Sequence, residues 1–138
     1  MSAASDRGLS DGEAELLIHG LADDVSFEWA LICLGVRQNP PATDAPPDAD
    51  QVAAAFASFE ALIAAGFVHL GRIEHIDPET PPPAPVRHIA EPIDVVRERV
   101  ERACAEAKHW SEWSFSCWLV TTDAGDAIAR QILDAGPS

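Results

Sequence analysis

The chain has 138 residues, of which 47% are hydrophobic, and its 23 acidic and 9 basic side chains give a formal net charge of -14. This length fits one domain, and the apolar content is sufficient to fill one core. The surplus of carboxylates repels nucleic-acid phosphates and attracts basic proteins, so it disfavours nucleic-acid binding. The alternative is that the acidic surface only keeps the protein soluble.

The N-terminal sequence and the cysteines indicate a reducing compartment. No apolar signal segment follows Met1, and the longest apolar run, residues 29–36, is too short to cross a bilayer. Cys33, Cys104 and Cys117 are an odd number of thiols in apolar surroundings, which predicts reduced core residues. We therefore expect a cytoplasmic protein without a membrane partner.

Three helices are expected in the first half of the chain, after a flexible segment over residues 1–9. Ser10 and Glu13 fit a capping box, which begins the first helix. The second helix is apolar nearly all round and should be deeply buried. Prolines make residues 38–48 a loop, and the third helix then carries an apolar stripe of Val52, Phe56, Phe59 and Ile63. The predicted helices span residues 10–21, 27–34 and about 50–65.

Two strands and two further helices are expected in the second half. Gly66 ends the third helix, and a strand follows it directly. Residues 78–85 form a proline-rich loop, and Pro92 opens the next helix. Apolar residues then alternate in the pattern of a strand with Trp113, Phe115, Cys117 and Leu119 on one face. The predicted elements are strands 67–70 and 113–120 and helices 92–107 and 123–133.

Two of these segments resemble parts of a winged-helix domain. Residues 59–68, Phe-Glu-Ala-Leu-Ile-Ala-Ala-Gly-Phe-Val, resemble the junction of recognition helix and wing in bacterial winged-helix regulators. Residues 117–129, which begin Cys-Trp-Leu-Val-Thr-Thr-Asp-Ala-Gly, resemble the end of the wing. The resemblance covers residues 10–135 and implies a single α+β domain with about five helices, a small antiparallel sheet and a helix inserted between the wing strands. The Cys-Trp-Leu and threonine–glycine ending is also similar to small actinobacterial proteins, which implies no particular activity.

The expected recognition helix differs from a DNA-reading helix in its charge. Residues 49–65 contain no lysine or arginine, although such helices need donors for base edges and positive charge for phosphates. They carry Asp50 instead, and Asp44 and Asp48 lie just before them. We therefore expect no appreciable binding of duplex DNA.

The sequence contains no common catalytic signature, so neither an enzyme activity nor a cofactor is expected. His69, His75 and His88 could approach one another and, with Asp77, supply ligands for zinc. The alternative is that these are separate surface histidines. Their spacing matches no known metal site, so we expect no bound metal.

Two tryptophans lie between the fourth helix and the predicted second strand. We expect Trp113 in the core, whereas Trp110 is either a core residue or an exposed anchor for a partner, because tryptophan is enriched at binding hot spots.

The leading hypothesis is a non-catalytic domain whose acidic surface binds a basic protein, as an immunity protein or antitoxin would bind a toxin. The alternative is a winged-helix transcriptional regulator, in which a homodimer would bring Arg97, Arg99 and Arg102 of two chains together into a basic surface. The expected partner-binding residues are Asp44, Asp48, Asp50, Glu74, Asp77 and Trp110.

Overall fold

The computed structural model describes residues 8–41, 43–77, 79–81 and 86–135, and in them six helices and one four-stranded antiparallel sheet are formed. In chain order the elements are α1 (Asp11–Gly20), β1 (Val25–Ser26), α2 (Phe27–Cys33), α3 (Ala49–Ala64), β2 (Val68–His75), β3 (Val86–Ala90), α4 (Ile93–Glu106), α5 (Trp110–Ser114), β4 (Trp118–Thr121) and α6 (Asp123–Ala135). The strand order in the sheet is β1–β4–β2–β3. The expected α+β class and the antiparallel sheet are confirmed.

Side-chain caps fix where the helices begin. Ser10 Oγ accepts a hydrogen bond from Glu13 N at 3.1 Å, and the Glu13 carboxylate accepts one from Ser10 N at 3.0 Å, which completes the predicted capping box. Asp48 and Gln51 form the same reciprocal pair at the start of α3. At the end of α3, Gly66 takes a φ of 79°, a left-handed conformation that suits glycine.

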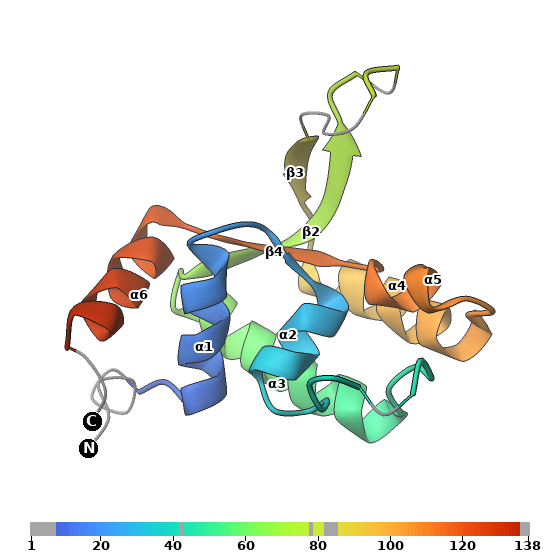
Figure 1. Cartoon of the computed structure of the whole chain (residues 1–138), viewed down its shortest axis with the longest axis horizontal. Coiled ribbons are helices and arrows are strands. Elements are labelled where there is room, and N and C mark those ends of the chain that lie inside the picture. The colour runs from blue at the N-terminus through green and yellow to red at the C-terminus, as the bar shows by residue number, and fades with distance from the viewer. Residues whose placement is uncertain (1–7, 42, 78, 82–85, 136–138) are drawn as a thin grey trace.

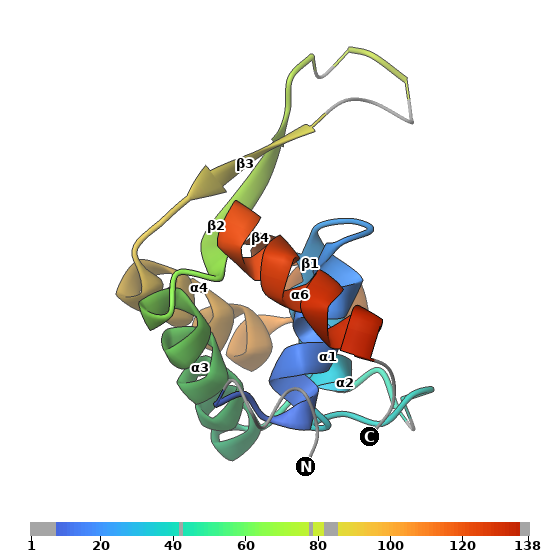
Figure 2. The same cartoon turned by 90° about the vertical axis from the view of Figure 1, so that its left-hand side faces the viewer.

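The sheet connects a helical body to a projecting hairpin (Figure 1). β1, β4 and the first half of β2 lie against the helices, whereas β2 continues with β3 beyond them. Viewed from the side, α3 and α4 lie on one side of the body and α1 and α6 on the other (Figure 2). Leu70 lies opposite Leu119 across β2 and β4, and further along β2 Gly71 lies opposite Ala90 of β3.

An aromatic cluster forms the middle of the core. Phe27 of α2 contacts Phe56 and Phe59 of α3 and Trp113 of α5, with ring centroids 6.3, 6.4 and 6.5 Å away. All four side chains are at most 1% exposed. Other helices and strands contribute Leu16, Leu17, Leu31, Leu62, Val68, Leu70, Val96, Val100, Leu119 and Ala129. This cluster therefore joins the first half of the chain to α5.

The two segments that resemble a winged helix pack against each other. Thr122 donates through its hydroxyl to Gly66 O at 2.6 Å and through its backbone to Phe67 O at 3.0 Å. A Cβ at Gly125 would lie 2.1 Å from Phe67 O, so the start of α6 approaches β2 as closely as it does because residue 125 is glycine. The junction after α3 and the strand-to-helix turn thus form one packed unit.

The predicted strand over residues 113–120 is wrong in its first half. Residues 110–114 form the short helix α5, and only Trp118–Thr121 are paired as β4. Glu112 accepts hydrogen bonds from the backbone N–H groups of Lys108 and His109 at 2.6 and 3.1 Å, which favours a helical turn over an extended chain. The apolar alternation was therefore misleading, and Phe115 is 45% exposed rather than on the buried face of a strand.

Two strands have no sequence signal strong enough to predict them. β1 has two residues, and β3 follows the proline-rich segment as an edge strand in which no residue is fully buried. The expected insertion between the two predicted strands is present but larger than one helix, since β3, α4 and α5 all lie between β2 and β4.

The N-terminal segment was expected to be flexible over residues 1–9. Residues 1–7 lie outside the described part of the chain, and Leu9 is buried against the core. None of the described helices is long and apolar enough to cross a membrane.

Phe59→Ala is expected to lower the free energy of unfolding by about 3–5 kcal/mol, because it removes a fully buried ring from the aromatic cluster. Urea denaturation followed by circular dichroism measures the change. Val95→Ala, at a side chain that is 47% exposed on α4, is the control and should change stability little. An unchanged denaturation midpoint for Phe59→Ala would show that the cluster does not stabilise the fold.

Candidate partner-binding site

Four of the six predicted partner-binding residues lie at one end of the molecule. Asp44 is in the loop before α3, Asp48 caps that helix, and Asp50 is in its first turn. Trp110 begins α5, which lies at the same end (Figure 1). We call these four residues the α3-end surface.

Arg37 holds the loop of this surface in place. Its guanidinium donates to Thr43 O at 2.6 Å and to Ala45 O at 2.9 Å, the carbonyls on either side of Asp44. The same group lies 4.6 Å from the ring centroid of Trp113, within the range of a cation–π contact. Only 12% of the Arg37 side chain is exposed, so these contacts fix a nearly buried cation.

Glu28 of α2 connects Arg37 to Trp110. Its Oε2 lies 3.3 Å from Arg37 Nε and accepts a 2.8 Å hydrogen bond from Trp110 Nε1. Arg37 Nε has no hydrogen bond of good geometry, so its contact with Glu28 is an ion pair by distance. Trp110 is 40% exposed while its indole N–H is held, and Trp113 is 1% exposed as expected of a core residue.

A cavity of about 360 Å³ separates the loop from α5. Its wall combines the acidic loop with the basic residues that precede α5, Lys108 and His109, and with both tryptophans. Trp113 Nε1 donates to Asp44 O at 3.3 Å across this space. The complete lining is Asp44, Ala45, Pro46, Ala107, Lys108, His109, Trp110 and Trp113. The cavity therefore brings Asp44 and Trp110, which are distant in sequence, to the rim of one hollow.

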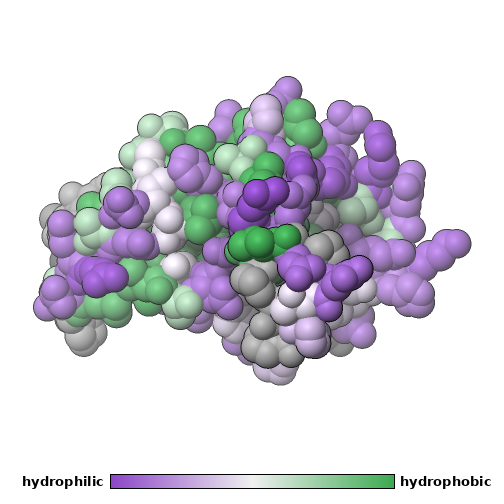
Figure 3. Space-filling model, turned by 90° about the horizontal axis from the view of Figure 1, so that it is seen from above, coloured by the Kyte–Doolittle hydropathy of each residue, from purple (hydrophilic) through white to green (hydrophobic). Residues whose placement is uncertain are grey.

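The three aspartates of the α3-end surface carry negative charge that the described residues do not compensate. All three are exposed, and none forms an ion pair within the described ranges. Hydrophilic side chains also dominate the end of the molecule that holds α4 and α5 when it is seen from the hairpin side (Figure 3). The three uncompensated aspartates, rather than this hydrophilic surface as a whole, suit a cationic ligand.

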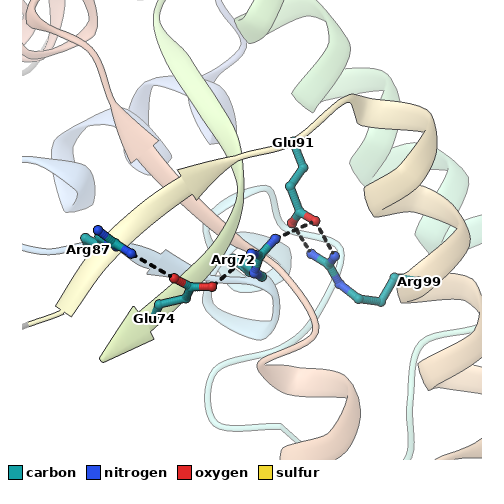
Figure 4. A network of polar contacts seen from close by, with 5 residues as sticks. All are labelled: Arg72, Glu74, Arg87, Glu91 and Arg99. Atoms are coloured by element: carbon teal, nitrogen blue, oxygen red, sulfur yellow. Dashed lines mark hydrogen bonds and ion pairs between the residues drawn. The ribbon is translucent and has the colours of Figure 1, made fainter. Parts of the chain in front are cut away.

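Glu74 lies apart from the α3-end surface, on the projecting hairpin, and its charge is compensated. Its two oxygens contact Arg72 at 2.9 Å and Arg87 at 3.4 Å (Figure 4). The hydrogen bond from Arg72, and after it that from Arg87, holds the pKa of Glu74 below its usual value. The network continues from Arg72 to Glu91, which also receives a two-point contact from Arg99 at 2.8 and 3.0 Å.

Asp77 also lies on the hairpin, and its carboxylate is used within the turn. It accepts hydrogen bonds from Thr80 Oγ1 at 2.8 Å and from Glu79 N at 3.0 Å. These bonds, that from Thr80 foremost, lower the pKa of Asp77. Glu74 and Asp77 are therefore not brought together with the other four predicted residues.

The groups considered for metal binding or nucleophilic chemistry have local roles. Within the described ranges, no three histidine, cysteine or acidic residues are close enough to hold a metal ion. The side chain of His75 lies outside the description, and the ring of His88 contacts Trp118 O at 3.1 Å. Burial raises the pKa of Cys33 to about 12 and that of Cys104 to about 11, so both are protonated thiols at neutral pH.

Sequence reasoning missed Glu28 and Arg37, because their interaction spans nine residues with a helix end between them and each could equally be a solvated surface charge. It also gave no role to the surface aromatics Phe115 and Trp118. A signal for surface aromatics was present in the sequence. Four aromatic residues fall within residues 110–118, and a single buried face of so short a segment cannot hold all four.

No protein-family model, curated protein or solved structure matches the chain.

Arg37→Met is expected to lower the free energy of unfolding by about 1.5–3 kcal/mol, because it removes two hydrogen bonds from a charged donor and leaves Glu28 without its counter-ion. Methionine keeps the apolar contact with Trp113. Urea denaturation of Arg37→Met, Glu28→Gln and the double variant measures the coupling, and the double variant should lose less than the sum of the single losses.

Arg102→Met is the control for Arg37→Met, because the exposed Arg102–Glu98 pair should contribute less than about 1 kcal/mol. Additive losses in the Arg37 and Glu28 variants would mean that the two residues do not act together.

Proposed function

We propose that the chain is a winged-helix-like domain that binds a basic protein through the α3-end surface. The observation that carries the proposal is the charge of α3. Every exposed residue of this helix is alanine, aspartate or glutamate, with no lysine or arginine. The helix therefore presents to a partner mainly alanine methyl groups, and its two exposed charges, Asp50 and Glu60, are both negative.

The strand order supports the winged-helix part of the proposal. β4 lies between β1 and β2, and β1 follows α1 while β2 follows α3. This is the strand order of a winged-helix sheet, in which α3 takes the place of the recognition helix. The elements β3, α4 and α5 then form an insertion within the wing.

A recognition helix of this composition is unsuited to DNA. Reading of base edges needs arginine, lysine, asparagine or glutamine side chains that reach into the groove, and alanine methyl groups supply only apolar contact. Gln51 is the one such residue in α3, and its half-buried amide is used on Asp48 N and Val36 O. Duplex phosphates approaching the helix would meet Asp44, Asp48 and Asp50, and their repulsion increases as salt is lowered.

The arginines elsewhere do not restore a basic surface. Each described arginine except Arg130 makes an ion pair with a glutamate. Arg97, Arg99 and Arg102 are the residues that a homodimer would combine. They pair with Glu101, Glu91 and Glu98, respectively. The positive charge of α4 is thus locally compensated, which weighs against DNA binding by a dimer.

A domain of this kind binds a basic partner by long-range attraction followed by contact at Trp110 and the loop of Asp44. Attraction between opposite charges speeds encounter, and an exposed tryptophan with a fixed N–H supplies contact area at low entropic cost. An immunity protein or antitoxin that covers the cationic site of a toxin is one concrete form. The alternative, a transcriptional regulator, is favoured only by the strand order.

The test removes charge from the α3-end surface without removing the helix cap. In D44N/D48N/D50N the asparagine at position 48 can still cap α3. Proteins that the wild-type domain captures from a lysate of its source cell are each purified. The kinetics with which each of them binds the wild-type domain and the variant are then measured. We expect one of them to be a basic protein. At low salt its association with the triple variant should be about ten-fold slower than its association with the wild-type domain, and its dissociation rate should change less.

The matched control is D94N/D123N/D134N, which removes the same charge from exposed positions on α4 and α6. Equal slowing in both triple variants would mean that net charge alone acts and the surface has no special role. Sub-micromolar binding of the wild-type domain to a specific duplex would replace the proposal with DNA recognition.

A further inference from the structure

Three surface aromatic side chains form a continuous ladder beside the α3-end surface. The rings of Trp110 and Phe115 meet edge to face, with centroids 5.2 Å apart and planes at 71°. Phe115 then stacks on Trp118 of β4, with centroids 5.5 Å apart and planes at 7°. Trp110 and Phe115 are 40% and 45% exposed, although aromatic side chains of this size are usually buried. We call Trp110, Phe115 and Trp118 the aromatic ladder.

The ladder continues onto the face of the sheet that points away from the core. Trp118 lies opposite Gly71 on one side and Ser26 on the other, whereas its neighbour Leu119 is buried. Because strand residues alternate between faces, Arg72 and Glu74 belong to the opposite face. Arg72, and Arg87 opposite Glu74, are therefore turned away from the ladder. His88 lies opposite Ile73 on the ladder's own face, and its ring contacts Trp118 O at 3.1 Å.

Two carboxylates lie near the ladder, each with a basic neighbour. Glu28 holds the indole N–H of Trp110 through Oε2, and its contact with Arg37 uses the same oxygen, so Oε1 has no hydrogen-bond partner among the described residues. Asp24 precedes β1, next to β4, and lies close enough to His88 for the two to interact electrostatically. Burial raises the pKa of Asp24 above its usual value, although His88 opposes this.

Lys108 and His109, just before Trp110 in sequence, line the cavity beside the loop. Arg99 Nε donates to Ser116 O at 2.8 Å, between Phe115 and Trp118. The aromatic rings themselves present negative π faces. Aromatic faces beside carboxylates form a surface complementary to a cation with a flat, weakly hydrated head.

We propose that the aromatic ladder binds an arginine side chain of a basic partner, with the guanidinium on the rings and its N–H groups directed to the neighbouring carboxylates. Arginine is favoured over lysine because a planar, delocalised guanidinium stacks on an aromatic face and donates in its own plane at the same time. This inference rests on the proposed function and adds to it the chemical identity of the contacting residue.

The test uses two fluorescently labelled peptides of equal length, one of alternating arginine and glycine and one of alternating lysine and glycine. Binding to the full chain is measured by fluorescence anisotropy at low salt. We expect the arginine peptide to bind about three- to five-fold more tightly than the lysine peptide. The preference should be lost in Phe115→Ala and also in Phe115→Leu, which keeps most of the apolar area but removes the ring.

Leu133→Ala, at a side chain that is 53% exposed on α6, is the control and should keep the preference for arginine. D44N/D48N/D50N should weaken both peptides to the same extent and leave their ratio unchanged. Equal affinities for the two peptides in the wild-type chain, or a preference that survives both Phe115 variants, would overturn the inference and leave the proposed function standing. Failure of both peptides to bind would overturn the proposed function and the inference together.

Discussion

The contacts of Arg37 determine the shape of the surface that we assign to partner binding. The guanidinium reaches three parts of the chain at once: the carbonyls of the loop around Asp44, the carboxylate of Glu28 and the ring of Trp113. Glu28 in turn holds the indole of Trp110. A nearly buried cation that satisfies several acceptors is costly to displace, so the loop and α5 keep one relative position.

The acidic surface and the aromatic ladder have different physical roles. Exposed carboxylates act over roughly 10 Å at moderate salt, so Asp44, Asp48 and Asp50 raise the rate of encounter with a basic partner without selecting its side chains. Aromatic rings act only on contact, and their preference for guanidinium over ammonium groups supplies selectivity. Trp110 belongs to both surfaces. A partner that is drawn by charge to the α3-end surface is therefore already beside the aromatic ladder.

The sequence predicted those parts of the fold whose signals are local. Capping residues and apolar spacing placed α1, α2, α3, α4 and α6, because a helix start is decided by side chains within a few residues. The alternation at 113–119 predicted a strand, yet Glu112 caps a helical turn there and β4 begins only at Trp118. β1 and β3 depend on pairing with distant strands, and the grouping of Asp44 with Trp110 depends on tertiary contacts, which no local pattern contains.

The central claim is that α3 and its preceding loop face a basic protein and not DNA, and an NMR titration of the isotope-labelled chain tests it most directly. Added arginine–glycine peptide should shift the indole N–H signal of Trp110 and the backbone amide signals of residues 43–45 and 48–51. An equimolar duplex of mixed sequence should leave the amide signals of α3 unchanged. Saturable shifts along residues 53–64 with duplex, and none with the peptide, would contradict the account.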